Sequence, residues 1–222
     1  TGLVDGQQYS YSVAVENAAG LAGAESSPYV IHIDTTAPTQ TVTITEIFDN
    51  KDPVTGVVSD GGFTNDDTPE IKGSLSAALA AGEVVNIYRD GVKVGTATVT
   101  GNTWSFSDAG LASGQSYKYT AQVEDLAGNT SGLSNEYGIT TNFDGASQAI
   151  NIIRVLDDVD PVQGPVSSGG YSNDNSPTLE GSIGAALNAG DTVVILRNGV
   201  EVGTATVTGT AWTYTDNLAA DG

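Results

Sequence analysis

The chain repeats its own sequence at an interval of 108 residues. Trp104 recurs as Trp212, and the run 95–101 recurs at 203–209. A period of this length corresponds to a whole domain, because solenoid units span only about 20 to 50 residues. Each copy is therefore expected to bury its own core, and the copies are expected to follow one another along the chain.

The register of the repeat predicts where the copies begin and end. Residues 1–34 align with 109–142, and residues 143–222 align with 35–114. We therefore expect the last two strands of one copy in 1–34, a complete copy in 35–142 and the first five strands of a further copy in 143–222. This register favours a chain cut from a longer tandem array.

The chain is strongly acidic, with 7 Lys and Arg against 27 Asp and Glu and a formal net charge of −20. This charge opposes binding to nucleic acids and to anionic membrane surfaces, and it suits divalent cations, among which Ca²⁺ is the natural candidate. The sequence has no Cys and a single His, His32, which excludes disulfides, thiolate chemistry and multi-histidine metal sites. No stretch of about 18 apolar residues is present, so membrane insertion is not expected.

Apolar residues alternate with polar ones, and turn residues interrupt them about every eight to twelve positions, which is the pattern of an all-β fold. In the complete copy we expect strands at 41–47, 69–75, 83–89, 92–100, 103–107, 116–124 and 133–142. Seven short strands in about a hundred residues predict a β-sandwich.

Two features predict the inner face of this sandwich. The apolar face of the sixth expected strand is made of Tyr117, Tyr119, Ala121 and Val123. Because side chains alternate across a strand, these residues should all face the core. Trp104 alternates with polar neighbours in the same way and is interpreted as a core anchor.

Two turn features predict the connections. Asp90-Gly91 lies between two strand-like runs, and the next copy has Asn198-Gly199 at the same place, so a type I′ hairpin is expected. Tyr117 follows a Gly-containing loop, as Tyr9 does in the preceding copy. This spacing predicts a tyrosine corner, although an ordinary core tyrosine remains an alternative. Together these features favour a seven-stranded immunoglobulin-like Greek-key β-sandwich.

Three motifs carry a resemblance to a known family. They are Asp-Thr-Thr-Ala-Pro-Thr at 34–39, Thr-Asn-Asp-Asp-Thr-Pro at 64–69 and Glu-Asp-Leu-Ala-Gly-Asn-Thr at 124–130. In this order and at domain spacing, the chain resembles the tandem bacterial immunoglobulin-like repeats of giant surface adhesins, including biofilm-associated proteins and type I secreted adhesins with calcium-stiffened extender regions. The resemblance covers the whole chain. It implies a secreted stalk module on a bacterial surface, with calcium held near the joints between domains.

Strand direction gives a physical reason for that placement. Seven strands that alternate in direction put the loop 125–130 at the end of the sandwich where the chain enters, and the acidic loop 48–68 at the end where it leaves. The first joint can supply Asp34, Asp125 and Asn129 as calcium ligands. The second can supply Asp49, Asp52, Asp66, Asp67, Asn142 and Asp144, and the next copy repeats this set with Asp157, Asp160 and Asp174.

Calcium takes six to eight oxygen ligands, which carboxylates, amide oxygens and loop carbonyls provide. No EF-hand spacing is present, so the prediction depends on the joints alone. The alternative reading of each Asp or Asn stays open, since these residues also make turns by accepting hydrogen bonds from their own backbone.

The predicted function is that of a structural stalk or extender of a bacterial surface adhesin, acting in cell adhesion or biofilm formation, with calcium stiffening the joints between neighbouring repeats. The alternative is a binding module for a glycan, a host protein or itself, and a third reading is an accessory domain of an enzyme. We expect no catalytic activity, because no pair of acidic residues lies in an apolar setting that would raise the pKa of one of them. His32 is expected to face solvent.

The partial copies predict a further partner. Residues 143–222 offer five strands and residues 1–34 offer the two that would complete them. With strands rising about 3.3 Å per residue, the two segments are expected at opposite ends of the complete copy, about 40 Å apart. We therefore expect head-to-tail association by strand complementation between different chains.

Overall fold

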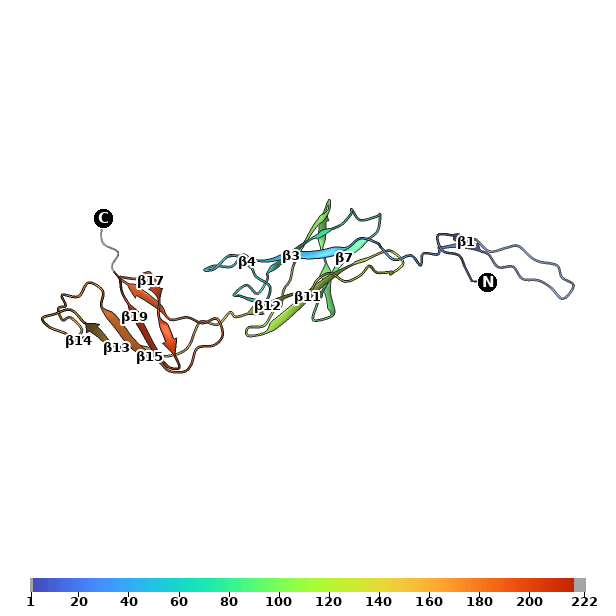
Figure 1. Cartoon of the computed structure of the whole chain (residues 1–222). Coiled ribbons are helices and arrows are strands. Elements are labelled where there is room, and N and C mark those ends of the chain that lie inside the picture. The colour runs from blue at the N-terminus through green and yellow to red at the C-terminus, as the bar shows by residue number, and fades with distance from the viewer. Residues whose placement is uncertain (1, 218–222) are drawn as a thin grey trace. The chain divides into compact units, whose positions relative to one another are not determined.

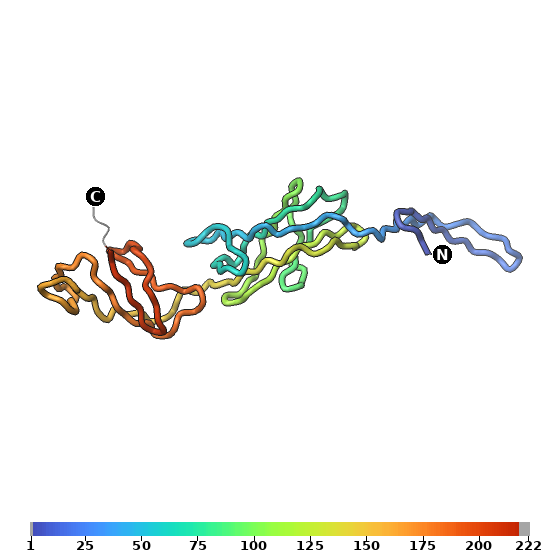
Figure 2. The backbone as a smooth tube through the Cα atoms, viewed as in Figure 1, coloured from blue at the N-terminus to red at the C-terminus, as the bar shows by residue number. Residues whose placement is uncertain are grey.

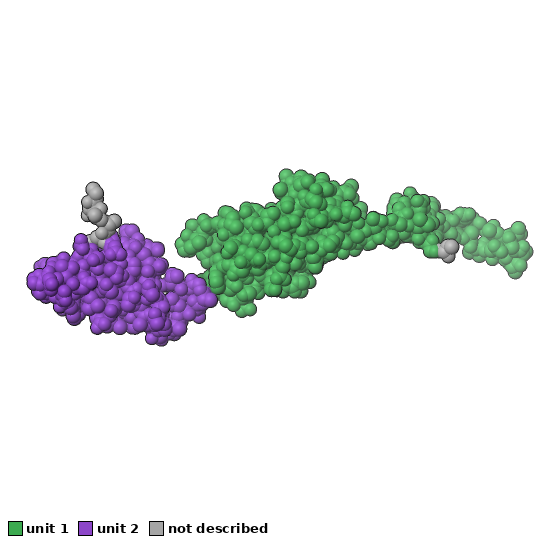
Figure 3. All heavy atoms as spheres, in the orientation of Figure 1, with its two compact units in different colours: residues 1–143 green, residues 144–222 purple. Residues whose placement is uncertain are grey.

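The computed structural model of this protein describes residues 2–217 of the 222-residue chain. All of its named elements are β-strands. The chain folds as two compact units, residues 1–143 and residues 144–222 (Figure 3). The first unit thus holds the predicted segments 1–34 and 35–142 together. Among the described residues, no helix is long and apolar enough to cross a membrane.

The complete repeat is a sandwich of two five-stranded sheets (Figure 1). One sheet has the order β4-β3-β6-β10-β9 and the other the order β5-β12-β11-β7-β8. The strands are β3 (Val42–Asp49), β4 (Gly56–Val58), β5 (Gly62–Thr64), β6 (Glu70–Leu75), β7 (Val84–Arg89), β8 (Val92–Thr96), β9 (Thr98–Thr100), β10 (Thr103–Ser107), β11 (Ser116–Glu124) and β12 (Tyr137–Thr141). The order β3-β6-β10-β9 opposite β7-β11-β12 is that of an immunoglobulin-like sandwich, so the predicted all-β Greek-key fold is confirmed.

The expected strand 92–100 is wrong as a single element. It divides into β8 and β9, which lie in different sheets. Val94 packs on the core from β8, whereas Ala97 and Val99 pack on it from β9 and the residue before it. The core-facing positions therefore change from even to odd numbers where the chain crosses from one sheet to the other.

Two short strands, β4 and β5, were not expected within the loop 48–68. β4 pairs with the end of β3, and β5 pairs with β12 in parallel. Only β12 holds β5 in the sheet, so no local pattern in the sequence marks it. The expected strand 133–142 is also shorter, since regular pairing begins at Tyr137.

The core forms where the two sheets face each other. Tyr119, Ala121 and Val123 of β11 are fully buried, and Trp104 of β10 is 3% exposed, which confirms both predictions of the inner face. Trp104 lies directly opposite Gly73 of β6. A Cβ atom at Gly73 would lie 2.1 Å from the Trp104 indole and 2.2 Å from the Thr43 carbonyl oxygen, so only glycine fits under this ring.

The predicted turns are present. Asp90 and Gly91 both have positive φ, at 52° and 79°, and Asn198 and Gly199 follow with 53° and 80°. These are the values that a type I′ hairpin requires.

The tyrosine corner is also present, in two copies. The backbone N–H of Ala112 donates a 2.8 Å hydrogen bond to the hydroxyl of Tyr117, and that of Val4 donates one of 2.9 Å to Tyr9. Because the bond spans five residues in each copy, it fixes the loop before the strand to the strand itself.

Residues 8–32 form a hairpin of β1 (Gln8–Tyr11) and β2 (Tyr29–His32), which the backbone trace shows as a two-stranded ribbon (Figure 2). Its register pairs Gln8 with His32. That is the pairing of Ser116 with Thr140 in the complete repeat, 108 residues later. His32 is exposed, as expected.

The second unit repeats the first sheet of the sandwich but only part of the second. Its strands are β13 (Ile150–Asp157), β14 (Gly164–Val166), β15 (Thr178–Ile183), β16 (Val194–Arg197), β17 (Val200–Thr204), β18 (Thr206–Thr208) and β19 (Ala211–Thr215). They form a five-stranded sheet of order β14-β13-β15-β19-β18 and a two-stranded sheet of β16 and β17.

The contact between Trp104 and Gly73 gives a stability prediction. Replacing Gly73 with Ala should destabilise the complete repeat by about 3 kcal/mol, because the added methyl meets a ring and a backbone carbonyl that cannot move aside. Urea unfolding followed by the fluorescence of Trp104, in a Trp212→Phe background, measures the change.

Gly132→Ala is the matched control. Nothing lies within 4 Å of a Cβ atom at Gly132, and its φ is not positive. This substitution should leave the free energy of unfolding within about 0.5 kcal/mol of the parent. Equal effects at the two glycines would show that the close approach at Gly73 does not matter.

Candidate metal sites

The loop 125–130 closes on the carboxylate of Asp125. Its Oδ1 accepts hydrogen bonds from the backbone N–H groups of Ala127, at 2.8 Å, and Asn129, at 2.9 Å. The side-chain amide of Asn129 donates to Asp125 Oδ2 at 2.9 Å and to the carbonyl oxygen of Asp34 at 3.1 Å. Three residues predicted for the first joint are thus brought together at the upstream end of the sandwich, where the chain enters it.

Hydrogen bonding holds the pKa of Asp125 below its usual value of 3.8, chiefly through the Asn129 side chain and then through the backbone N–H groups of the turn. In the preceding copy Asn17 occupies the same position. Its amide oxygen accepts from Ala19 at 2.9 Å and Leu21 at 3.0 Å, the same two bonds without a charge. The turn therefore needs a hydrogen-bond acceptor at this position, but it does not need the negative charge that Asp125 carries.

A shallow hollow adjoins this loop. Its walls include three carboxylates, those of Asp34, Glu83 and Asp125, together with Gln40. The amide of Gln40 donates to Glu83 Oε2 at 2.6 Å, while its Oε1 is buried and has no hydrogen-bond partner within residues 2–217. An unpartnered acceptor oxygen beside carboxylates suits a hard cation such as Ca²⁺, so the chemistry of this donor set fits the predicted metal.

At the downstream end, where the chain leaves the sandwich, Asp49 and Asp66 are buried. Asp49 accepts from the hydroxyl of Thr64 at 2.6 Å and from the backbone of Lys51 at 2.8 Å. Asp66 accepts from the backbone of Thr68 at 2.8 Å and of Asn50 at 3.1 Å. All four carboxylate oxygens are bonded to the protein itself, so both side chains already act as internal acceptors that close the loop 48–68.

Other predicted residues at this end also have protein partners. Asp67 forms a 2.8 Å ion pair with Lys51, which lowers the pKa of Asp67. The carbonyl oxygen of Asp52 accepts from Asn65 at 2.8 Å. The next copy has Val159 in place of Lys51 and Asn175 in place of Asp67, so both charges are replaced together. Because the two residues are replaced together, Lys51 is interpreted as the ion-pair partner of Asp67.

Asn142 contributes its backbone, which donates a 2.8 Å bond to the carbonyl of Thr64. Its side chain is exposed. Asp144 is exposed in the second unit.

The second unit repeats the internal use of its carboxylates. Asp157 accepts from the Ser172 hydroxyl at 2.6 Å, and Asp174 accepts from the backbone of Ser176 at 2.7 Å. The carbonyl oxygen of Asp160 accepts from Asn173 at 2.8 Å.

Across the described residues, no group of three or more Asp, Glu or His side chains is close enough to hold a metal ion by itself. A calcium site here would therefore need amide and carbonyl oxygens as well as carboxylates. The upstream hollow offers such an oxygen in Gln40 Oε1, which has no hydrogen-bond partner within residues 2–217. All four oxygens of the buried pair Asp49 and Asp66 accept hydrogen bonds from the protein, as both oxygens of Asp125 do. The assignment of calcium to any of these residues stays a prediction.

A buried polar cluster escaped the sequence reasoning. The hydroxyl of Tyr119 donates to Asp108 Oδ2 at 2.7 Å, and Arg89 donates to the same oxygen at 2.7 Å. Burial, followed by the neighbouring Asp108, raises the pKa of Tyr119 well above its usual value. The recurrence of Arg89 and Asp108 as Arg197 and Asp216 was the available signal.

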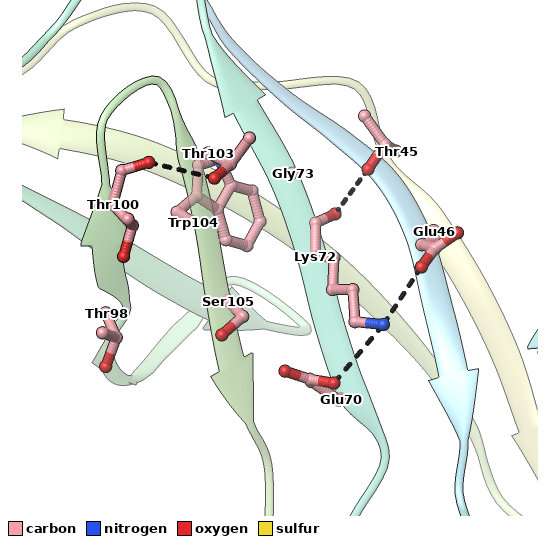
Figure 4. A pocket seen from close by; sticks show the side chains of 10 residues that line it. All are labelled: Thr45, Glu46, Glu70, Lys72, Gly73, Thr98, Thr100, Thr103, Trp104 and Ser105. Atoms are coloured by element: carbon pink, nitrogen blue, oxygen red, sulfur yellow. Dashed lines mark hydrogen bonds and ion pairs between the residues drawn. The ribbon is translucent and has the colours of Figure 1, made fainter.

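Another hollow lies on the outer face of the first sheet (Figure 4). It is lined mainly by Thr and Ser side chains, with Lys72 held by Glu46 at 3.2 Å and Glu70 at 3.5 Å. The indole of Trp104 is buried, so it offers no stacking surface here.

Comparisons with known proteins agree with the fold. Residues 39–141 match the bacterial Ig-like domain family. The chain is also 29% identical over 150 residues to exoglucanase B of Cellulomonas fimi. That alignment covers 65% of this chain and 12% of the exoglucanase, so the similarity spans a small part of the relative's length.

The state of Asp125 gives a pH prediction. In the folded protein the pKa of Asp125 lies below 3.8. The hydrogen-bonded carboxylate of Asp125 therefore stabilises the fold above that pH. Its contribution should be lost as the pH falls through the lowered value. Asp125→Asn keeps the turn, as Asn17 does, but cannot titrate. Urea unfolding between pH 7 and pH 3, reported by Trp104, should therefore show a smaller acid loss for this variant than for the parent chain, and identical acid losses would contradict the assignment.

Proposed function

We propose that this chain is a load-bearing spacer, built from tandem Ig-like sandwiches, in an exported bacterial protein. The observation that supports it most is the parallel pairing of β5 with β12 in the complete repeat. β5 lies near the start of the repeat and β12 at its end, so this pair joins the two parts of the module on which tension acts. The bond from Asn142 to the carbonyl of Thr64 extends the same ladder into the linker.

Parallel pairing resists tension because of its geometry. When the two ends are pulled apart, β5 and β12 slide in opposite directions along their common axis. The evenly spaced hydrogen bonds of a parallel ladder are then loaded together rather than one after another. A module of this kind transmits force without needing a binding pocket or a catalytic centre.

Force spectroscopy on the whole chain, held by its two ends, tests this proposal. Thr64→Pro removes the N–H that faces β12, on the residue whose carbonyl accepts from Asn142, and should lower the unfolding force of the complete repeat. Thr64→Val keeps the N–H and removes the hydroxyl that donates to Asp49, so it separates the ladder bond from this side-chain bond.

Val57→Pro is the matched control, because Pro165 occupies the same position of β14 in the second unit. β4 is an edge strand that pairs with β3 alone. This variant should keep the parental unfolding force. Equal losses for Thr64→Pro and Val57→Pro, or no loss for Thr64→Pro, would contradict a load-bearing role for the β5–β12 pair.

The setting we propose is the stalk of a surface adhesin that acts in adhesion or biofilm formation. The three motifs that resemble adhesin repeats support it, as does the match of residues 39–141 to bacterial Ig-like domains. The proposed location is the bacterial cell surface or the medium outside the cell, and no catalytic activity is proposed.

We further propose that calcium stiffens the first joint. Asp34 and Asp125 would hold the ion in the upstream hollow, together with Gln40 Oε1 and carbonyl oxygens. The ion would offset the mutual repulsion of these carboxylates in a chain of net charge −20. It would also tie the linker at Asp34 to the loop 125–130, which Asn129 already joins by a hydrogen bond.

Thermal unfolding with excess Ca²⁺, with Mg²⁺ and with a chelator tests this site. A ligand that binds only the folded state at 100 times its Kd stabilises it by about 2.7 kcal/mol. We expect a rise in Tm with Ca²⁺ for the parent chain and little rise with Mg²⁺. Asp125→Asn should keep the Tm seen in chelator, because the turn persists, and lose the response to calcium. An unchanged response in this variant would remove Asp125 from the site.

A second setting is favoured by the relative. Exoglucanase B is by name a polysaccharide-degrading enzyme, and the chain aligns with 12% of it. The same spacer could then separate modules of a secreted carbohydrate-active enzyme. Sedimentation with insoluble cellulose distinguishes a spacer from a glycan-binding module, since a spacer stays in the supernatant and a glycan-binding module is carried into the pellet.

A further inference from the structure

The linker 34–36, between the hairpin and the complete repeat, is held by a carboxylate. Asp5 Oδ1 accepts a hydrogen bond from the backbone N–H of Thr35 and a second one, of 2.9 Å, from the hydroxyl of the same residue. Asp5 Oδ2 accepts a 2.6 Å bond from the hydroxyl of Thr36. The Thr36 hydroxyl first, and then the Thr35 backbone, hold the pKa of Asp5 below its usual value of 3.8. Asp5 is therefore ionised at neutral pH, and its three bonds to the linker are charge-assisted.

The complete repeat holds the same linker from the other side. The side-chain amide of Asn129 donates to the carbonyl oxygen of Asp34 at 3.1 Å. The backbone N–H of Thr36 donates to Asp34 Oδ1 at 3.1 Å, which closes a turn within the linker. The two sets of bonds overlap along the chain. Asp34, which comes first, is bonded to the downstream repeat, whereas Thr35 and Thr36 are bonded to a loop of the upstream copy.

This overlap leaves no free residue between the two copies. A hinge is a short stretch of residues that absorbs changes in φ and ψ. Such residues must be able to rotate without breaking a contact on either side. In the linker 34–36, a rotation of the backbone would break the bonds to Asp5, the bond to Asn129 or both.

The complete repeat uses the position of Asp5 in the same way. The counterpart 108 residues later is Ser113, and the counterpart of Thr35 is Phe143. The hydroxyl oxygen of Ser113 accepts a 2.9 Å bond from the backbone N–H of Phe143, which also packs on the core of the repeat. In both copies the tyrosine corner fixes the residue immediately before this position. The loop before the corner therefore holds the linker twice in this chain.

We propose that Asp5 and Asn129 form a clamp on the linker 34–36, which keeps the joint between the two copies rigid without a metal ion. This inference rests on the proposed function, because a spacer keeps its length under load only if its joints do not bend freely. It adds Asp5 to the first joint, for which the sequence predicted Asp34, Asp125 and Asn129. All the bonds of the clamp join protein groups to one another, so the clamp acts before any calcium binds.

Backbone ¹⁵N relaxation of the full chain, recorded in a chelator, tests the clamp. The order parameter S² reports picosecond-to-nanosecond motion of each N–H group. The parent chain should give S² of about 0.85 at Thr35 and Thr36, the value of rigid backbone, and Asp5→Ala should lower both below about 0.6. Asp5→Ser introduces the residue type of Ser113, so it should keep Thr35 close to its parental value. Asn129→Ala should lower S² at Asp34.

Thr36→Val tests the clamp from the linker side. Valine keeps the shape and the N–H of Thr36 but lacks the hydroxyl that donates to Asp5, so S² at this residue should fall towards its value in Asp5→Ala. Thr36 is exposed, so the exchange should not disturb the fold. Thr39→Val is the matched control, because it makes the same exchange at an exposed position that is not a partner of Asp5. The control should keep the parental S² throughout 34–36.

Three results would overturn the proposal. The parent chain in chelator could show S² below about 0.6 at Thr35 and Thr36. Asp5→Ala and Thr36→Val could both keep the parental values. The linker could also become ordered only when Ca²⁺ replaces the chelator, which would leave the rigidity of the joint to the metal. The amide signal of Val4, which donates to Tyr9, verifies that the tyrosine corner is intact in each variant.

Failure of the clamp and failure of the proposed function are distinguishable. The unfolding force of the complete repeat depends on the β5–β12 pair, which contains no residue of the linker 34–36. A mobile linker with a parental unfolding force would reject the clamp alone. A rigid linker with no loss of force in Thr64→Pro would reject the load-bearing pair and keep the clamp.

Discussion

Closure of one sheet over the other is the requirement on which this structure depends. In the complete repeat, β11 and β7 cover β3 and β6, and the indole of Trp104 lies against the bare backbone of Gly73. Burial of this shared apolar face supplies most of the driving force for the fold. Within residues 2–217, Val15 and Ile152 are exposed, although they hold the repeat positions of the buried Val123 and Ile44.

The acidic side chains at the ends of the sandwich act as hydrogen-bond acceptors within their own loops, and this role needs no metal ion. Asp49, Asp66 and Asp125 accept hydrogen bonds from backbone groups of their own loops, and so pin the loops that connect the module to its neighbours. Asn17 performs the same function as Asp125 without a charge. At the position of Asp125, a carboxylate and an amide make the same two backbone hydrogen bonds, and the carboxylate adds a negative charge. The upstream hollow, with Gln40 and Glu83, is where that charge gathers.

Much of the fold could be predicted because it is encoded locally. The inner face of β11, the hairpin at Asp90-Gly91 and the corner at Tyr117 each depend on a few neighbouring residues whose geometry is limited by sterics and hydrogen bonding. The strand β5 and the division of 92–100 could not be predicted in the same way. Both depend on which sheet a segment joins, and that choice is made by distant partners such as β12.

The sequence by itself determined the repeat of 108 residues, the all-β class, the core positions of Trp104 and Tyr119 and the loops in which acidic residues gather. Only the tertiary structure decided which acidic side chains are occupied as internal hydrogen-bond acceptors and which distant segments pair, as β5 and β12 do. The physical reason is that composition and periodicity record what a residue prefers, whereas its hydrogen-bond partners and its burial depend on segments up to about a hundred residues away along the chain.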